Sequence, residues 1–129
     1  MLKLNKIHHI AIIASDYNKS KHFYTEILGL KVVREVYRET RASYKLDLEV
    51  GGQYQIELFS FPSPPARPSR PEAAGLRHLA FEVDNIDEAI AAIKNFGVMV
   101  EPIRIDEFTG KRFTFFADPD DLPIEFVEK

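Results

Sequence analysis

Residues 7–12 read Ile-His-His-Ile-Ala-Ile, and residues 76–81 read Leu-Arg-His-Leu-Ala-Phe. Each stretch is an apolar run interrupted by histidine, and its content of branched and aromatic residues favours a β-strand. His9 and His78 occupy matching places in the two stretches and are 69 positions apart. The chain therefore contains a candidate internal repeat, and the repeat decides the fold.

The same spacing recurs at two further residue types. Gly29 and Gly97 are 68 positions apart, and Glu57 and Glu125 are also 68 positions apart. A histidine, a glycine after a helical pattern and a glutamate thus recur in one order, with a shift of one residue. Two His…Glu pairs in register are hard to assign to chance, so we predict two modules of the same topology.

The first module is predicted to be β-α-β-β-β. Asp16 can cap a helix in which apolar residues recur at helical spacing, and Gly29 can end it. Gly51-Gly52 is typical of a hairpin turn. The predicted strands are Lys6–Ala14, Lys31–Tyr37, Ser43–Val50 and Tyr54–Phe61.

The second module repeats this order after a proline-rich segment, Pro62–Ala74, which contains five prolines. A helix is predicted at Asp84–Phe96, and strands at Leu76–Val83, Val98–Arg104, Arg112–Ala117 and Pro123–Val127. We therefore predict an α+β fold of two βαβββ modules, at residues 1–61 and 76–129, with a linker at 62–75.

Composition limits the function classes. The chain has 129 residues and no cysteine, which excludes disulfides, thiolate metal sites and a cysteine nucleophile. The net charge of −3 argues against nucleic acid as a partner. No apolar run in the N-terminal region is long enough to span a membrane or to act as a signal peptide. We expect a cytoplasmic protein.

Four polar residues lie inside the predicted apolar strands: His9, Glu57, His78 and Glu125. A buried carboxylate is costly unless it is paired or binds a metal. Two imidazoles, two carboxylates and one divalent cation form a neutral site, and nitrogen and oxygen ligands suit Ni, Co, Zn, Mn or Fe. The alternative is that each histidine is satisfied by hydrogen bonds and each glutamate faces solvent.

These features resemble the vicinal oxygen chelate superfamily, and the ligand set is closest to glyoxalase I. Phe-Tyr at 23–24 and Asp-Pro-Asp at 118–120 also resemble this family. A short bacterial glyoxalase-like subgroup whose function is not established resembles the chain more closely still, at residues 56–62, 67–73 and 111–116. The resemblance implies a curved mixed sheet around a metal held by the four residues, with Glu125 or Glu57 as the proton-transfer base.

Two positions depart from glyoxalase I, which has polar glutathione contacts where this chain has Ile13 and Phe61. Ile13 lies four residues after His9, and Phe61 lies four residues after Glu57. Residues four apart in a strand share a face, so both should face the ligand cavity. The expected substrate is therefore smaller or more apolar than a glutathione conjugate. Arg112 is the best candidate to grip an anionic substrate group, and Arg67 and Arg70 are further candidates.

The predicted function is that of a metal-dependent, glyoxalase I-like (lactoylglutathione lyase-type) enzyme, which transfers a proton on an oxygen-chelating small molecule. One alternative is another metalloenzyme of the family, a dioxygenase or a thiol transferase. A second alternative is a protein that binds a small molecule without chemistry. The modules could pair within one chain or across a homodimer.

Overall fold

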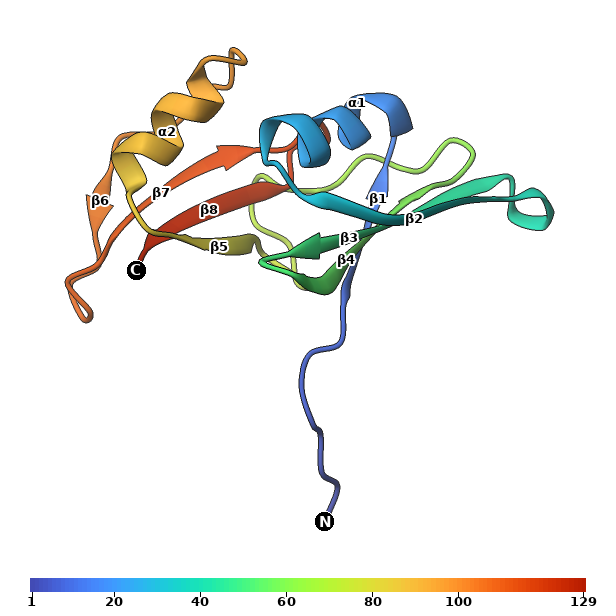
Figure 1. Cartoon of the computed structure of the whole chain (residues 1–129), viewed down its shortest axis with the longest axis horizontal. Helices are drawn as coiled ribbons and strands as arrows, with labels where there is room; N and C mark the ends of the chain where they lie inside the picture. Colours follow the sequence, from blue (N-terminus) through green and yellow to red (C-terminus); the bar gives the residue numbers. More distant parts are fainter. The chain divides into compact units, whose positions relative to one another are not determined.

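The computed structural model describes residues 1–129, which divide into two compact units, Met1–Pro65 and Ala66–Lys129. Each unit is built from a mixed four-stranded sheet and a helix that follows the first strand (Figure 1). The predicted α+β fold of two βαβββ modules is confirmed. Neither helix has the length and apolar character that a membrane crossing requires.

The sheet of the first unit has the order β1-β4-β3-β2. Strand β1 pairs with β4 in parallel, and the other pairs are antiparallel. Its buried apolar side chains, such as Leu46 and Leu48 or Ile56 and Leu58, come from alternate positions, so one face of the sheet forms the core. The strands are β1 Ile10–Ala14, β2 Lys31–Arg38, β3 Ser43–Val50 and β4 Gln53–Ser60.

The helical segment of the first unit begins where the sequence predicts. Asp16 caps α1, Tyr17–His22, by accepting a hydrogen bond from the Lys19 N–H. The chain continues as a π-helical turn at Phe23–Ile27, which buries Phe23 and Tyr24. Gly29 then takes a positive φ of 73° and ends the helical segment.

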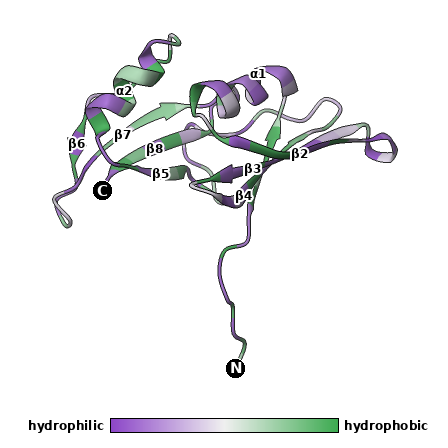
Figure 2. Ribbon diagram, in the orientation of Figure 1, coloured by the Kyte–Doolittle hydropathy of each residue, from purple (hydrophilic) through white to green (hydrophobic).

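The second unit repeats the sheet topology in the order β5-β8-β7-β6, with β5 and β8 parallel. Asn85 caps the helix that follows β5, and this helix shows alternating hydrophobic and hydrophilic patches (Figure 2). Its buried residues, Ile86 and Ile93, belong to the core of the unit. The elements are β5 Leu79–Val83, α2 Ile86–Lys94, β6 Arg104–Ile105, β7 Arg112–Ala117 and β8 Pro123–Glu128.

The first strand of each unit starts later than predicted, so His9 and His78 lie just before β1 and β5 rather than inside strands. In the second unit, β5 pairs with β8 from Leu79 opposite Ile124 onward. One step earlier, the partner would be Pro123, which has no N–H to donate. In the first unit, β1 is an edge strand with the single neighbour β4, and its pairing starts at Ile10.

The predicted strand at Val98–Arg104 is wrong, because only Arg104–Ile105 pairs with β7. Pro102 lies in the middle of this stretch and cannot donate a hydrogen bond to the sheet. Two hydrogen bonds still hold the stretch beside β7: the Glu101 N–H donates to the Phe115 carbonyl, and the Glu101 carbonyl accepts from the Thr114 hydroxyl.

Part of the proline-rich segment packs against the second unit. The Ser69 hydroxyl donates to the Asp121 carbonyl, and Arg70 forms an ion pair with the Asp121 carboxylate. The Arg67 guanidinium donates to the Leu76 carbonyl. The predicted three-part division with a linker at 62–75 stays a prediction. In the structure, residues 66–73 belong to the second unit and form one wall of a pocket there.

Candidate functional site

Strand alternation places Glu57 on the face of its sheet that is opposite to the core. Its neighbours Ile56 and Leu58 are buried in the core, so the Glu57 side chain must point the other way. The residue is nevertheless only 7% exposed. A carboxylate in such a place needs partners, because burial disfavours its charge.

Glu125 has the equivalent place in the second unit. Ile124 and Phe126 flank it in β8 and are buried in the core. Glu125 pairs in register with Ala80 of β5 and Phe115 of β7, so these three residues share one face of the sheet. The repeat seen in the sequence thus corresponds to a repeat in side-chain direction.

Each glutamate lies beside the histidine of its own unit. His9 Nε2 is 3.5 Å from a carboxylate oxygen of Glu57, and His78 Nε2 is 3.4 Å from one of Glu125. Two ligand atoms that are each about 2.0–2.2 Å from one transition-metal ion lie roughly 3–3.6 Å apart. Each His–Glu pair therefore has the spacing of two adjacent ligands of one ion.

No group of three or more histidine or carboxylate side chains in the structure could hold a metal ion. The structure shows two His–Glu pairs, one per unit, and the assembly of all four residues around one ion remains a prediction. The donor atoms fit such an ion chemically, because imidazole nitrogen and carboxylate oxygen are ligands of Zn, Fe, Ni, Co and Mn.

Two further polar side chains contact the carboxylate of Glu57. The Tyr54 hydroxyl donates to Glu57, and the Lys45 ammonium lies 3.8 Å from the other carboxylate oxygen. Burial and then the bond to Glu57 raise the pKa of the Tyr54 hydroxyl above its usual range. Tyr54 is therefore a neutral donor that fixes the position of Glu57.

Asp47 lies directly opposite Glu57 in the β3–β4 register and is 1% exposed. Lys45 Nζ is 2.7 Å from Asp47, and Arg34 Nη2 is 3.0 Å from it. Burial acts to raise the pKa of the Asp47 carboxyl, but hydrogen bonds from Lys45, Tyr54 and Arg34 outweigh it, so this pKa is lowered. Asp47 is thus charged and holds Lys45 beside Glu57.

Glu125 has a much barer environment. Its only ionic neighbour in the structure is His78, and no tyrosine or lysine donates to it. The Nδ1 atom of His78 is buried without a hydrogen-bond partner. The imidazole ring packs edge-on against Phe115, with ring centres 5.1 Å apart. The two His–Glu pairs are therefore alike in geometry and different in their hydrogen bonding.

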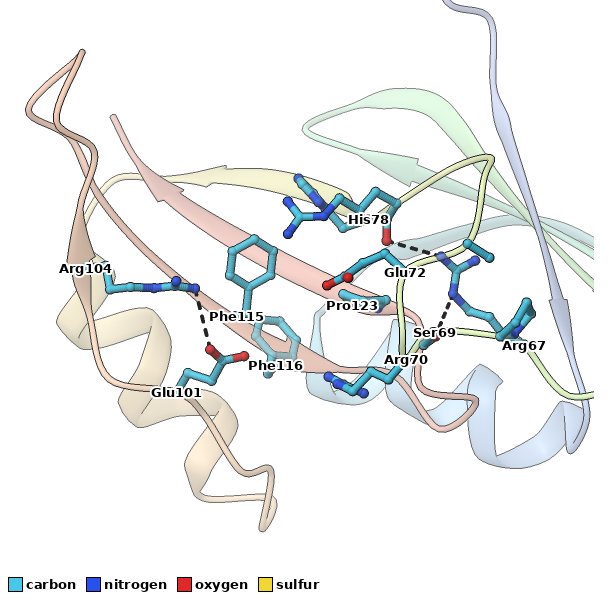
Figure 3. A pocket seen from close by; sticks show the side chains of 13 residues that line it. Arg67, Ser69, Arg70, Glu72, His78, Glu101, Arg104, Phe115, Phe116 and Pro123 are labelled. Carbon is cyan, nitrogen blue, oxygen red and sulfur yellow. Dashed lines mark hydrogen bonds and ion pairs between the residues drawn. The ribbon is translucent and has the colours of Figure 1, made fainter.

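A pocket of about 210 Å³ opens beside His78 in the second unit. Phe115, Phe116 and Pro123 form its apolar part, and the remaining lining is mostly charged (Figure 3). Four arginines and two glutamates contribute to this lining: Arg67, Arg70, Arg77, Arg104, Glu72 and Glu101. The pocket therefore combines an aromatic surface with an excess of positive charge.

The two apolar substrate-site candidates lie in the first unit. Ile13 is 52% exposed and pairs in register with Phe59, on the same face as Glu57. Phe61 follows the end of β4 and stacks on Phe59, with ring centres 5.9 Å apart. The Arg41 guanidinium lies 5.5 Å from the centre of the Phe61 ring. Both candidates thus remain apolar surface on or next to the sheet face that carries Glu57.

Arg112 does not line the pocket. It forms two hydrogen bonds with Glu128, of 2.9 and 2.7 Å, and a third with Asp87 at 3.0 Å. These bonds from Arg112, followed by that from the Ile86 N–H, lower the pKa of the Glu128 carboxyl. In β7, Arg112 lies on the opposite face from Phe113 and Phe115, and its side chain is directed to Glu128 and Asp87.

The residues that sequence reasoning missed are Tyr54, Lys45 and Asp47 around Glu57, and Arg77 and Arg104 in the pocket. Asp47 carried little signal of its own, because Lys45, Asp47 and Glu49 alternate with apolar residues and resemble an ordinary solvated strand face. The register that brings Asp47 opposite Glu57 could have been counted through the Gly51-Gly52 turn.

Comparison with known proteins gives three findings. The model of the Glyoxalase/Bleomycin resistance protein/Dioxygenase superfamily matches residues 6–126. The uncharacterized protein YaeR of Escherichia coli strain K12 is 62% identical over 129 residues and is covered, like this chain, at 100%. A solved glyoxalase family protein from Enterococcus faecalis is 53% identical, with a TM-score of 0.87, 95% of this chain covered and 97% of that one.

At lower identity, the chain is also similar to a protein whose name states an enzymatic activity. The lactoylglutathione lyase of Schizosaccharomyces pombe is 27% identical over 145 residues. The match covers 96% of this chain and 47% of the yeast protein.

Proposed function

The chain belongs to the glyoxalase/bleomycin resistance protein/dioxygenase superfamily, and from this membership we propose that it is a metal-dependent enzyme of the glyoxalase I type. The proposed reaction moves a proton on a small substrate that carries two adjacent oxygens. The observation that carries the proposal is the His–Glu pair, repeated in both units at 3.5 and 3.4 Å. The similarity to lactoylglutathione lyase supports the reaction class.

In this proposal one divalent transition-metal ion is held by His9, Glu57, His78 and Glu125. When bound, the ion would act as a Lewis acid toward a substrate oxygen. Two carboxylates balance its charge, which removes the cost of burying them unpaired. The four ligands would come from both units of one chain, or from two chains of a homodimer.

The two glutamates would have different roles. The carboxylate of Glu57 already accepts a hydrogen bond from Tyr54 and lies near Lys45, so it is a fixed ligand. Glu125 has no such donors, and its one ionic neighbour is His78, which lies against one oxygen and leaves the other to approach a substrate carbon. We therefore assign the general base to Glu125, which takes a proton from one substrate carbon and returns it to the next.

The proposed substrate is small and does not contain glutathione. Ile13 and Phe61 provide no polar group to bind a peptide-like anchor, and Phe61 is already stacked on Phe59. A polar ligand group that is buried against such side chains loses hydrogen bonds worth about 1–3 kcal/mol each. A compact α-hydroxycarbonyl compound avoids this loss.

The first test is metal binding, because it does not depend on the substrate. Ni, Co, Zn and Mn would be titrated into chelator-treated protein and followed by calorimetry, with His9→Gln and His78→Gln as site variants. We expect one ion per four-ligand site, and at least a tenfold loss of affinity in either variant. His22→Gln, in α1, is the matched control. Unchanged affinity in His78→Gln would contradict the proposal.

The second test separates the two glutamates. Hydroxyacetone would be incubated in D₂O with metal-loaded protein, and exchange of its carbon-bound hydrogens would be followed by NMR. Because both glutamates are proposed ligands, each variant would be assayed at a metal concentration that saturates it. Glu125→Gln should then abolish exchange, whereas Glu57→Gln should lower the affinity for the ion and keep exchange once the ion is bound. Exchange that persists in Glu125→Gln would refute its role as base. Metal binding without any exchange would instead favour a non-catalytic binding protein.

A further inference from the structure

We propose that the pocket of the second unit binds an oxyanion, a carboxylate or phosphate group carried on a small apolar body. This inference rests on the proposed function in one respect, since it names the class of molecule that would lie beside His78. The pocket itself is complete within residues 66–129 and needs no metal for its definition.

Arg67 contributes a positive charge that the protein holds but does not neutralise. Its guanidinium donates to the Ser69 hydroxyl at 2.9 Å and to the carbonyls of Leu76 and Arg77 at 2.6 and 3.2 Å. All three acceptors are uncharged. The guanidinium is therefore fixed in place at the pocket wall, with its charge available to a ligand (Figure 3).

Arg104 contributes a second positive charge from the opposite side of Phe115 (Figure 3). Its guanidinium lies over the rings of Phe113 and Phe115, 5.1 and 5.6 Å from their centres. Its one ion pair, with Glu101, is 3.5 Å long and joins two side chains that are more than half exposed. Such a pair is weak in water, so an oxyanion can compete for Arg104.

The other charges in the lining leave the positive excess intact. Arg70 is satisfied by both carboxylate oxygens of Asp121, at 2.9 and 2.7 Å. The guanidinium of Arg77 has no ion-pair partner in the structure, and neither does the carboxylate of Glu72. An unpaired arginine fork matches the geometry of a carboxylate or phosphate.

The apolar surface and the volume define the rest of the ligand. Phe115, Phe116 and Pro123 would contact a flat or compact carbon framework, and 210 Å³ is below the roughly 300–1,000 Å³ typical of drug-sized ligands. His78 lines the same pocket, so a molecule held by the arginines has its other end within reach of the His78–Glu125 pair.

The test uses phenyl phosphate and benzoate as probes, with benzyl alcohol as the uncharged analogue. Binding would be measured by NMR titration at low salt, with protein as purified and again after chelation. We expect saturable binding of at least one anion, no comparable binding of benzyl alcohol, and weakening with added salt. The phosphate and carboxylate arms then decide which oxyanion is preferred.

Arg77→Gln and Arg104→Gln should each weaken anion binding at least fivefold. Both side chains are exposed enough that the variants should keep the parent melting temperature. Lys94→Gln, near the end of α2, removes the same charge from the same unit outside the pocket and is the control. Equal affinity in the parent and both arginine variants, or equal binding of benzyl alcohol, would overturn the inference. Anion binding that survives when metal binding fails would overturn only the proposed function, and the reverse result would overturn only this inference.

Discussion

Replacement of Asp47 by asparagine tests the charge network that fixes Glu57. Asp47 is 1% exposed, and it accepts hydrogen bonds from Lys45 Nζ at 2.7 Å and from Arg34 Nε and Nη2 at 3.2 and 3.0 Å. Asparagine has the same size but no charge, and it replaces one acceptor oxygen by a donor group. Lys45 then faces the neighbouring Glu57 alone.

The expected magnitude follows from the exposure of the two partners. The Arg34 side chain is 63% exposed, so solvent screening leaves its pair worth less than about 1 kcal/mol. The Lys45 side chain is 19% exposed, and a hydrogen bond between charged groups in such a place is worth roughly 1.5–3 kcal/mol. Together these give a loss of about 1.5–4 kcal/mol in the free energy of unfolding. For a chain of this size that corresponds to a melting temperature roughly 5–16 °C lower.

The loss should depend on pH in a defined direction. The pKa of Asp47 is lowered in the folded protein, against burial, by its hydrogen bonds. Its stabilisation is therefore fully present above the unfolded-state pKa of about 3.9 and is lost as the pH falls through the folded value. The difference in melting temperature between parent and Asp47→Asn should be constant above about pH 5 and should shrink below about pH 4.

Thermal unfolding followed by circular dichroism between pH 3 and pH 8 measures this difference. Glu49→Gln removes a carboxylate from the same strand, without these partners, and is the control. Equal melting temperatures of parent and Asp47→Asn at pH 7 would refute the argument. So would a difference that stays constant down to pH 3.

Four further outcomes are expected. Arg112→Gln should lower the melting temperature without changing anion binding, and this loss should fade as Glu128, whose pKa is lowered, is protonated in acid. Asn85→Ala removes the cap of α2 and should cost about 1 kcal/mol in unfolding free energy, measured by urea titration. Chelation of metal-loaded protein should lower the melting temperature, because it leaves the two site carboxylates without the cation that balances them. Turnover of the methylglyoxal–glutathione hemithioacetal should stay below the usual kcat/KM of about 10⁴–10⁸ M⁻¹s⁻¹, and Ile13→Arg with Phe61→Asn should raise affinity for glutathione conjugates.

The repeat could be predicted from the sequence because its markers are local. A glycine with positive φ ends the helical segment at Gly29, and Gly97 has the same conformation, so both positions show in the sequence. The direction of Glu57 and Glu125 could also be inferred from strand alternation. The start of β5 at Leu79 could not be predicted from the sequence. It depends on Pro123, which lies 44 positions later in the partner strand and has no N–H to donate.

The pocket was harder to predict than the glutamates. Arg112 and Arg104 are both basic residues near predicted strands, and composition alone cannot rank them. The register of β7 with its neighbours distinguishes the two arginines. It places Arg112 on the same sheet face as Glu128 and pairs Arg104 with Phe113. The unpaired state of Arg77 is a property of the folded loop around it, which the sequence does not encode in a short pattern.

The wall that residues 66–73 add to the second unit bears on how such a chain could be rearranged. The stretch that joins the modules supplies Arg67 and Arg70 to the pocket, so the pocket depends on this connector as well as on the repeated module. If the chain were divided before Ala66, all residues that line the pocket would stay on one fragment. If it were divided after Ala73, Arg67 and Arg70 would be separated from the rest of the pocket. Two modules with the same strand order can thus differ in the binding surface that a connector adds to one of them.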